Sequence, residues 1–263
     1  MIMKKVLNVI AAATVTVAVT TSCGILSNTN WDSAQLGSAM GKMATAASIT
    51  DEQVIEICRQ STAQLDAQNT IENGAYNQRL QRLVKSVKID GLPLNFKVYK
   101  TAEVNAFASA DGSVRVYTGL MDIMDDDQLI SILGHEIGHV ELKHVKESLG
   151  KAYRTSAARD VINAAGTIGA VSQTLVGDLA ETVVNSKFSQ QNEYEADEYG
   201  FAFAIRNGHD PYSMYKALNK LVELSGDSSK ASALATMFSS HPDSQKRATK
   251  VKALADQYVA SKK

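Results

Sequence analysis

Apolar residues recur at the spacing of an α-helix over most of the chain beyond residue 50. Val54, Ile57 and Leu65 follow residues 50–53 (TDEQ), which match a capping box at a helix N-terminus. The same spacing predicts a second helix over residues 75–87. A further helix begins near Asp125, because three successive aspartates there favour a helix N-terminus, and most of the chain beyond it is also helical in pattern.

Alternation with a period of two marks a few short strands in the middle of the chain. Residues 94–99 form one such run, and two more, residues 104–108 and 113–119, flank Asp111 and Gly112. An Asp-Gly pair between two β-type runs predicts a hairpin with a type I′ turn. We therefore expect an α+β fold that is mostly helical, with a small β-sheet or hairpin beside the helix near Asp125.

The longest apolar run lies at the start of the chain. Residues 6–19 contain no charged residue and follow Lys4 and Lys5. The run is shorter than the roughly 20 residues that span a bilayer, so it is typical of a signal peptide. Small residues then lead into Cys23 as in a bacterial lipobox, although Thr20 stands where such boxes usually carry Leu. We expect acylation of Cys23; ordinary secretory cleavage and an uncleaved anchor are the alternatives.

This pattern divides the chain into three parts. Residues 1–22 are the expected lipoprotein signal peptide, and residues 23–48, rich in Ser, Asn, Ala and Gly beyond the cysteine, are the expected lipid anchor and tether. Residues 49–263 form the expected folded domain. The protein is expected to face the periplasm as a lipoprotein of the bacterial envelope, at the outer membrane. Cys58 falls in a helical apolar pattern, so we expect it to be buried.

Composition narrows the classes of function. The 263 residues carry 27 Lys and Arg against 28 Asp and Glu, a formal net charge of −1. No overall basic field exists to hold a nucleic-acid backbone, so we expect no nucleic-acid partner. Two cysteines are too few for a thiolate zinc site. Any metal would have to be bound by histidine and carboxylate.

An HExxH motif, HEIGH at residues 135–139, lies within the helix near Asp125. Residues four apart share a helical face, so His135 and His139 can reach one metal ion, and Glu136 can serve as a general base beside it. Zinc suits such a site. The alternative is a helix that carries two surface histidines and a glutamate.

A third ligand has to come from elsewhere in the chain. Glu193 and Asp197 are again four residues apart, in a predicted helix that begins after the motif. One carboxylate can bind the metal while the other holds a ligating histidine through its ring N–H. The alternative is an acidic, solvated helix N-terminus.

With these motifs the chain resembles the gluzincin peptidases of the CAAX prenyl protease and HtpX type, which form metallopeptidase family forty-eight. Within this family it is similar to a branch of soluble lipoproteins. The resemblance covers roughly residues 48–260. The segments that carry it, besides the HExxH motif, are residues 193–197 (EYEAD), 104–108 (VNAFA), 114–122 (VRVYTGLMD) and 185–190 (NSKFSQ).

The resemblance implies a zincin-like domain with one Zn²⁺ ion per chain. It implies that His135, His139 and Glu193 are the ligands, that Glu136 is the general base and that Asp197 stands behind a ligating histidine. The family also carries a His-Pro with a downstream Arg, matched here by His241-Pro242 and Arg247.

His241 and Arg247 are therefore candidate catalytic residues, since a cation facing the cleft would stabilise the oxyanion of peptide hydrolysis. His241 could instead occupy the fourth position of zinc and leave the enzyme latent. The alternative is a purely structural role, in which these residues belong to a capped C-terminal helix with an ion-paired arginine. His144 lies about 140° around an ideal helix from His139, so we expect it at the surface.

Substrates of this chemistry usually pair with a strand edge beside the metal-binding helix. The expected edge comprises Val104, Asn105, Ala106, Phe107 and Ala108. The expected function is hydrolysis of peptide bonds in unfolded or damaged envelope proteins by a membrane-anchored zinc endopeptidase. The alternative is a non-catalytic or latent zinc lipoprotein that acts as a chaperone or assembly factor.

Overall fold

The computed structural model describes residues 51–152, 182 and 184–262. The expected signal peptide, Cys23, the tether and Thr50 of the capping box lie outside these residues. The helices within them are α2 (Asp51–Gln68), α3 (Ala75–Val84), α4 (Thr118–Ile123), α5 (Asp126–Glu141), α8 (Gln190–Arg206), α9 (Ser213–Ser225), α10 (Ala231–Ser240) and α11 (Ser244–Ala260). Residues 144–152 are helical as well. The mostly helical α+β class is confirmed.

A four-stranded sheet occupies the N-terminal half of the described chain. Its strands are β1 (Ile71–Glu72), β2 (Asn95–Tyr99), β3 (Ala106–Ala108) and β4 (Ser113–Tyr117). The order is β1-β2-β4-β3, and the two central strands, β2 and β4, run parallel, with Val98 opposite Val116. Strand β3 pairs antiparallel with β4, so the predicted hairpin is confirmed and β3 lies at an edge of this sheet.

The turn of that hairpin differs from the predicted type I′. Gly112 has a φ of +85°, but Asp111 is not among the residues with positive φ, and type I′ requires positive φ at both central positions. Instead the N–H of Gly112 donates to the carbonyl of Ser109, at 2.9 Å, and a turn spans residues 109–112. The carboxylate of Asp111 accepts from the N–H and hydroxyl of Ser113, which provides the polar contacts of this turn.

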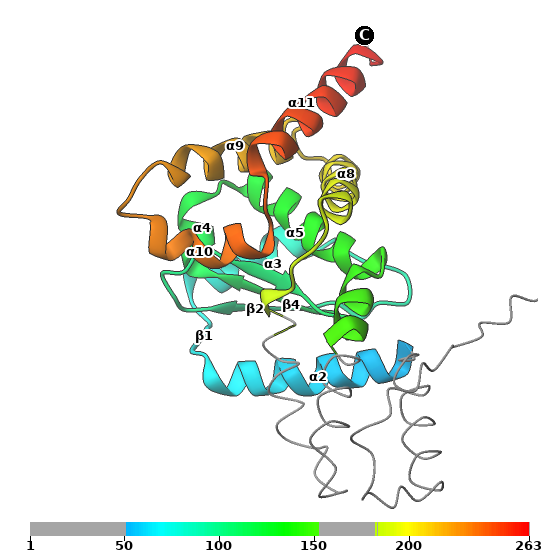
Figure 1. Cartoon of the computed structure of the whole chain (residues 1–263), viewed down its shortest axis with the longest axis vertical. Helices are drawn as coiled ribbons and strands as arrows, with labels where there is room; N and C mark the ends of the chain where they lie inside the picture. Colours follow the sequence, from blue (N-terminus) through cyan, green and yellow to red (C-terminus); the bar gives the residue numbers. More distant parts are fainter. Residues whose placement is uncertain (1–50, 153–181, 183, 263) are drawn as a thin grey trace, which may run out of the picture. The chain divides into compact units, whose positions relative to one another are not determined.

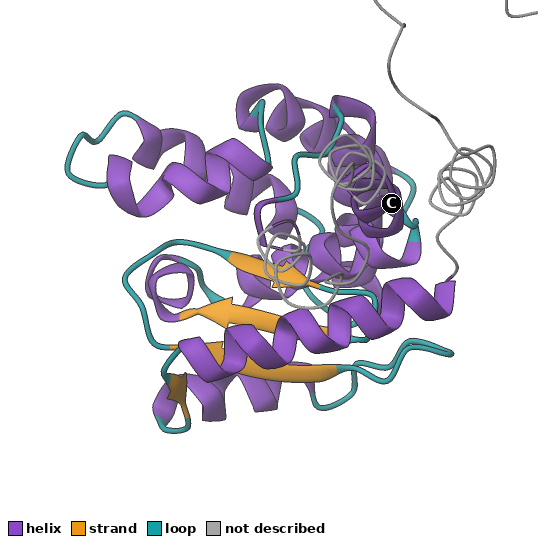
Figure 2. Ribbon diagram, turned by 60° about the horizontal axis from the view of Figure 1, so that its bottom comes forward, coloured by secondary structure: helices purple, strands orange, loops and turns teal. Residues whose placement is uncertain are grey.

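Alternate residues of the strands pack on two different layers. Val98, Val116 and Ala106 join the main core with α3, α5 and α9 on one face of the sheet. Tyr99, Phe107 and Tyr117 point to the other face, where α2 and residues 144–152 cover them. The sheet is thus sandwiched between α2 and α5 (Figures 1 and 2). Cys58 of α2 is buried in this second layer, as expected, and burial raises the pKa of its thiol to about 12.

A buried arginine ties α2 to the sheet. The side chain of Arg115 in β4 is 2% exposed and forms a bidentate pair with Asp66 of α2, at 2.7 and 2.9 Å. Lys97 and the hydroxyl of Tyr99 bind the same carboxylate. The charge of Arg115 is therefore neutralised within the packed layer rather than left unpaired.

Helices α5 and α8 approach closely because each carries a glycine where it lies against the other helix. A Cβ on Gly200 of α8 would stand 2.7 Å from the carbonyl oxygen of Ser131 and 3.0 Å from the backbone nitrogen of His135. A Cβ on Gly134 of α5 would stand 2.7 Å from Phe203. Only hydrogen fits at these positions, and the two backbones can therefore lie close enough to share a site.

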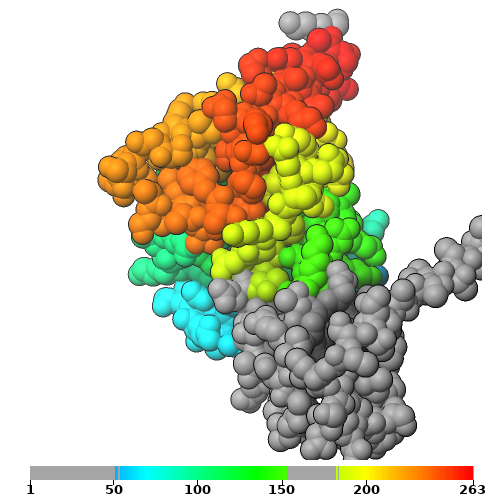
Figure 3. Space-filling model, viewed as in Figure 1, coloured from blue at the N-terminus to red at the C-terminus, as the bar shows by residue number. Residues whose placement is uncertain are grey.

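Helices α9, α10 and α11 complete the fold around α5 and α8. Met214 and Leu218 of α9 pack against Ala248 and Val251 of α11, and α8, α10 and α11 adjoin on one face (Figure 3). Residues 207–212 separate α8 from α9, and residues 226–230 separate α9 from α10. Over the described residues, every helix is too short or too polar to cross a bilayer.

Candidate metal centre

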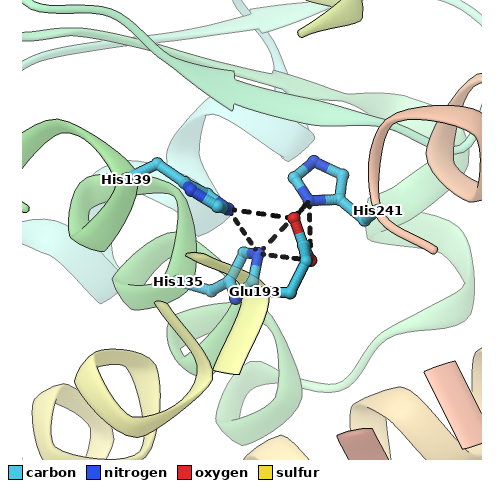
Figure 4. Close-up of side chains that lie close together, drawn as sticks. All are labelled: His135, His139, Glu193 and His241. Atoms are coloured by element: carbon cyan, nitrogen blue, oxygen red, sulfur yellow. Dashed lines mark hydrogen bonds and ion pairs between the residues drawn. The ribbon is translucent and has the colours of Figure 1, made fainter. Parts of the chain in front are cut away.

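The HExxH motif lies in the middle of α5, which begins at a well-formed N-cap. The carboxylate of Asp125 accepts from the N–H of Gln128, and the side chain of Gln128 accepts from the N–H of Asp125. His135, Glu136 and His139 are all buried. The Nε2 atoms of the two histidines face each other at 3.1 Å (Figure 4).

Helix α8 brings two carboxylates to this pair. Ser189 and Asn192 form a capping box at its start, so Glu193 stands in the first turn. Its Oε1 lies 3.5 Å from His139 Nε2 and its Oε2 lies 3.7 Å from His135 Nε2. One turn further on, Asp197 Oδ1 lies 2.9 Å from His135 Nδ1. The two carboxylates therefore contact opposite nitrogens of His135.

His241 reaches the same point from the end of α10. Its Nδ1 lies 3.3 Å from His135 Nε2 and 3.2 Å from Glu193 Oε1. Its Nε2 lies 3.6 Å from Glu136 Oε1. The structure thus gathers four possible ligands, His135, His139, Glu193 and His241, whose ligand atoms all lie within 4.8 Å of one another.

These separations fit a tetrahedral zinc ion. Zinc binds histidine nitrogen and carboxylate oxygen at about 2.0–2.2 Å, which places neighbouring ligand atoms of a tetrahedron about 3.3–3.6 Å apart. The closest separations between ligands here are 3.1 Å for the two motif histidines, 3.2 Å for His241 and Glu193, 3.3 Å for His135 and His241, and 3.5 Å for His139 and Glu193.

The chemistry of the donor set points the same way. Burial holds the pKa of His139 well below its usual value, so its imidazole is neutral. The Nδ1 of His135 faces the carboxylate of Asp197 and so carries that ring's proton, which leaves a lone pair on its Nε2. The lone pairs of these imidazoles and the carboxylate of Glu193 then meet in the protein interior, an arrangement that a bound cation stabilises.

Arg247 supports the two carboxylates from behind. Its Nη1 lies 2.6 Å from Glu193 Oε2, and its Nε and Nη2 form a bidentate pair with Asp197 at 2.8 and 2.7 Å. Burial acts to raise the pKa values of both carboxyl groups, but His241 and then Arg247 hold the pKa of Glu193 below its usual range, and Arg247 does so for Asp197. Arg247 is ion-paired, as expected for a purely structural arginine, but its partners are carboxylates of the site. Its predicted oxyanion role stays a prediction.

Glu136 lines a cavity of about 20 Å³ together with His135, His241 and Arg247. Such a volume holds about one water molecule. Burial raises the pKa of Glu136. A carboxyl with a raised pKa accepts a proton more readily than an exposed one does.

His144 is buried, not at the surface as the helical spacing predicted. Its side chain is 3% exposed, and its Nδ1 lies 3.0 Å from His139 Nδ1. The prediction is wrong because α5 ends at Glu141 and Lys143 has a φ of +65°, so the chain turns before the next helical segment begins. His144 therefore returns toward His139 instead of continuing around one helix.

Two further residues lie at the site that the sequence pattern does not single out. Glu195 Oε2 lies 3.2 Å from His144 Nε2. The ring of Phe188 stacks on His139 with centroids 3.8 Å apart and an interplanar angle of 15°. Neither residue has a spacing signal of its own, because each reaches the motif only through the packing of α8 and the segment before it.

The predicted substrate strand lies at the sheet edge, but its residues are buried. Val104 donates its N–H to the carbonyl of Ala233 in α10, and Ala106 donates its N–H to the side chain of Asn105. Val104, Asn105, Ala106, Phe107 and Ala108 are all buried. Pairing with a peptide therefore stays a prediction, and it requires α10 to move away from this edge.

Comparisons with known proteins agree with this geometry. Residues 70–255 match the profile of peptidase family M48. The chain is 38% identical to metalloprotease LoiP of Escherichia coli K12 over 85% of this chain and 88% of that protein. It is 35% identical to metalloprotease YcaL of the same organism, over 89% and 94%. Its identity to the E. coli β-barrel assembly-enhancing protease is 33%, over 54% of this chain and 31% of that protein.

Proposed function

The chain belongs to peptidase family M48 and is a metallopeptidase, and we propose that its metal is zinc and its substrates are unfolded or damaged proteins of the bacterial envelope. We also propose that a lipid on Cys23 anchors it to the membrane, with the domain facing the periplasm from the outer membrane.

The observation that carries the zinc proposal is the convergence of two imidazoles and one carboxylate from two helices. His135 and His139 of α5 and Glu193 of α8 have ligand atoms 3.1–3.7 Å apart. Three protein ligands of the types His, His and Glu are those of catalytic zinc sites. Among the described residues, the cluster offers only imidazole and carboxylate ligands, which are ligand types that zinc binds.

Zinc, when bound, polarises the scissile carbonyl and makes water more acidic. The residues of the chain supply the rest of the chemistry. Glu136 takes a proton from the attacking water and passes it to the leaving amine, a transfer that its raised pKa assists. Asp197 holds His135 in one tautomer through a 2.9 Å contact, and Arg247 holds Asp197.

The substrate class and location rest on the sequence and on one relative's name. A protease that enhances β-barrel assembly acts on a process of the outer membrane, where such barrels occur. This chain spans only 31% of that relative. The predicted signal peptide and the lipobox-like sequence before Cys23 support a location in the same envelope.

Hydrolysis of unfolded casein by the purified protein, with and without a chelator, tests the activity. We expect cleavage that the chelator abolishes and zinc restores. The Glu136→Gln variant should bind zinc and cleave nothing, since an amide keeps the shape of the side chain but cannot take the proton. Near-normal turnover by that variant would contradict the role of Glu136 as the general base.

Fractionation of cells that express the Cys23→Ser variant tests the anchor. We expect an unprocessed or unlipidated protein. A processed variant that still carries lipid label in the membrane fraction would show that Cys23 is not the anchor.

A latent form of the same enzyme is favoured by a second observation, the burial of the whole centre. His139, Glu193 and Glu136 are at most 4% exposed, and the adjoining cavity is the size of one water molecule. His241 Nδ1 lies 3.3 Å from His135 Nε2, where a fourth ligand would stand. This geometry favours a role for His241 as a fourth ligand that closes the site, rather than a role in stabilising the oxyanion.

Casein hydrolysis by the His241→Ala variant separates these two roles. A closing ligand predicts faster hydrolysis without it, because catalytic zinc needs an open position. Slower hydrolysis at unchanged zinc content would favour the oxyanion role. The chaperone alternative would be favoured if the wild-type protein binds zinc and suppresses aggregation of unfolded proteins, and if neither it nor the His241→Ala variant cleaves casein.

A further inference from the structure

The two motif histidines are supported in different ways. Each ring turns its Nε2 toward the other, so each has an Nδ1 that faces away from the cluster (Figure 4). The Nδ1 of His135 faces a carboxylate directly, Asp197 Oδ1 at 2.9 Å. The Nδ1 of His139 faces a third imidazole instead, His144 Nδ1 at 3.0 Å.

A carboxylate lies behind that third imidazole. His144 Nε2 is 3.2 Å from Glu195 Oε2, and Glu195 Oε1 accepts from the side chain of Gln191 at 2.7 Å. Glu195 is 42% exposed at its side chain, whereas His144 is 3% exposed. The chain of contacts therefore runs from the buried ligand, through a buried imidazole, to a partly solvated carboxylate.

The direction of the hydrogen bonds along this chain follows from its two ends. Glu195 only accepts, so the proton of a neutral His144 ring lies on Nε2 and its Nδ1 carries a lone pair. His139 must then donate from Nδ1, which leaves its own lone pair on Nε2, toward the cluster. This is the tautomer that ligates a metal through Nε2.

We propose that His144 is a positioning residue for the metal centre, and that Glu195 acts through it. His144 fixes the ring orientation and the tautomer of His139, as Asp197 does for His135. The proposal rests on the zinc site proposed above. It gives a role to a histidine and a glutamate that belong neither to the HExxH motif nor to the ligand set.

Two substitutions of similar size and branching test the hydrogen bond itself. In His144→Asn the side-chain oxygen can stand near the place of Nδ1 and accept from His139, whereas His144→Leu offers no acceptor. We expect His144→Leu to weaken zinc binding about 10–100-fold and His144→Asn to restore most of that affinity. Zinc dissociation constants are measured by competition with a chromophoric chelator on the purified full-length protein in detergent.

A double-mutant cycle tests the part of Glu195. Glu195→Ala should weaken zinc binding less than His144→Leu does, because a partly exposed carboxylate is screened by solvent. In the His144→Leu background the same substitution should change nothing, since two residues that act through one contact are not additive. An equal effect of Glu195→Ala in both backgrounds would overturn its action through His144.

His209→Leu is the matched control. His209 also pairs with a carboxylate, Asp127 Oδ1 at 2.6 Å, but outside the cluster. Its loss should leave zinc affinity unchanged. Far-UV circular dichroism and thermal melting of the metal-free variants report whether each folds.

The outcomes separate this inference from the function on which it rests. A wild-type protein that binds no zinc would overturn the proposed function. If the wild-type protein binds zinc and a folded His144→Leu variant binds it with equal affinity, only the role of His144 is overturned. Equal weakening by His144→Asn and His144→Leu would also overturn it, because the loss would then come from packing and not from the acceptor.

Discussion

Glu193 and Glu195 stand two residues apart on α8 and face different histidines. Glu193 is fully buried beside the Nε2 atoms of His135 and His139. Glu195 is half-buried and its side chain contacts His144. Residues two apart on a helix differ by about 200° around its axis, so both cannot face α5.

Alanine substitutions along α8 should separate these carboxylates. We expect Glu193→Ala to lose its zinc and all activity, and Asp197→Ala to weaken metal affinity or activity about 10–100-fold. Glu195→Ala should be mild by comparison. Elemental analysis of bound zinc measures all three, and a metal-free Glu195→Ala beside a zinc-replete Glu193→Ala would contradict the assignment.

Much of the centre follows from local spacing, and the rest depends on where the chain turns. The i,i+4 pairs His135 with His139 and Glu193 with Asp197 could be read from the sequence, because one helix holds each pair. The place of His144 could not, since it depends on a positive φ at Lys143. The bidentate contact of Arg247 with Asp197 joins α11 to α8, and spacing along one helix does not predict contacts between helices.

At the scale of elements, the centre depends on how closely α8 lies to α5. A Cβ on Gly200 would stand 2.7 Å from a backbone oxygen and 3.0 Å from a backbone nitrogen of α5, neither of which is flexible. Helix α8 carries Glu193 and Asp197, so any separation of the two backbones also moves these carboxylates away from the histidines.

Gly200→Ala should therefore lower stability and zinc affinity together. Overpacking costs about 1–3 kcal/mol, and the better helix propensity of alanine offsets about 1 kcal/mol of it. Urea unfolding and chelator competition measure the two effects. Gly226→Ala is the control, because its Cβ would meet its nearest atom at 3.7 Å. Unchanged zinc affinity in Gly200→Ala would show that the centre tolerates a wider helix spacing.

The pair of Asp66 and Arg115 should dominate the attachment of α2 to the sheet. Arg115 is buried, so Asp66→Asn leaves its charge without a counterion and should destabilise the fold by about 3 kcal/mol at neutral pH. Glu56→Gln, which breaks an exposed pair with Arg59 on the same helix, should have no measurable effect.

The difference between wild type and Asp66→Asn should disappear in acid. Burial acts to raise the pKa of Asp66, but hydrogen bonds from Arg115, Lys97 and Tyr99 hold it below its usual value. The stabilisation is thus present above the unfolded pKa of about 3.9 and is lost as pH falls through the lower folded pKa. Urea unfolding at neutral pH and near the folded pKa measures this, and a constant difference at both would contradict the pairing.

The small sheet was predicted in part, for reasons that differ between its strands. Period-two alternation marks β2, and the Asp-Gly pair marks the hairpin of β3 and β4. The parallel pairing of β2 with β4 and the short strand β1 carry no local signal, since they depend on which segments the helices bring together.

At the scale of the whole molecule, the proposed zinc ion joins segments from three regions of the chain. His135 and His139 belong to α5, Glu193 to α8, and His241 to the end of α10. An ion that binds only the folded state stabilises it by about 4 kcal/mol when its concentration is 1,000 times the dissociation constant.

Removal of zinc should therefore lower the melting temperature. For a protein of this size, each kcal/mol corresponds to about 2–4 °C, so a chelator should lower the midpoint by about 8–16 °C. Differential scanning calorimetry with and without the chelator measures the shift. The Glu193→Ala variant should melt at the same temperature in both conditions, and a wild-type protein that does so would contradict a structural contribution from the metal.

The separation of these segments along the chain also governs when catalysis can begin during synthesis. His241 is 106 residues beyond His135, and Arg247, which neutralises Glu193 and Asp197, is 112 residues beyond it. A ribosome delivers the N-terminal part first, at about 5–20 residues per second. Until residue 247 emerges, Glu193 and Asp197 lack the guanidinium that pairs with both of them. A chain that ends before residue 247 should therefore lack a fully formed metal centre, so we expect proteolytic activity to depend on synthesis of α11.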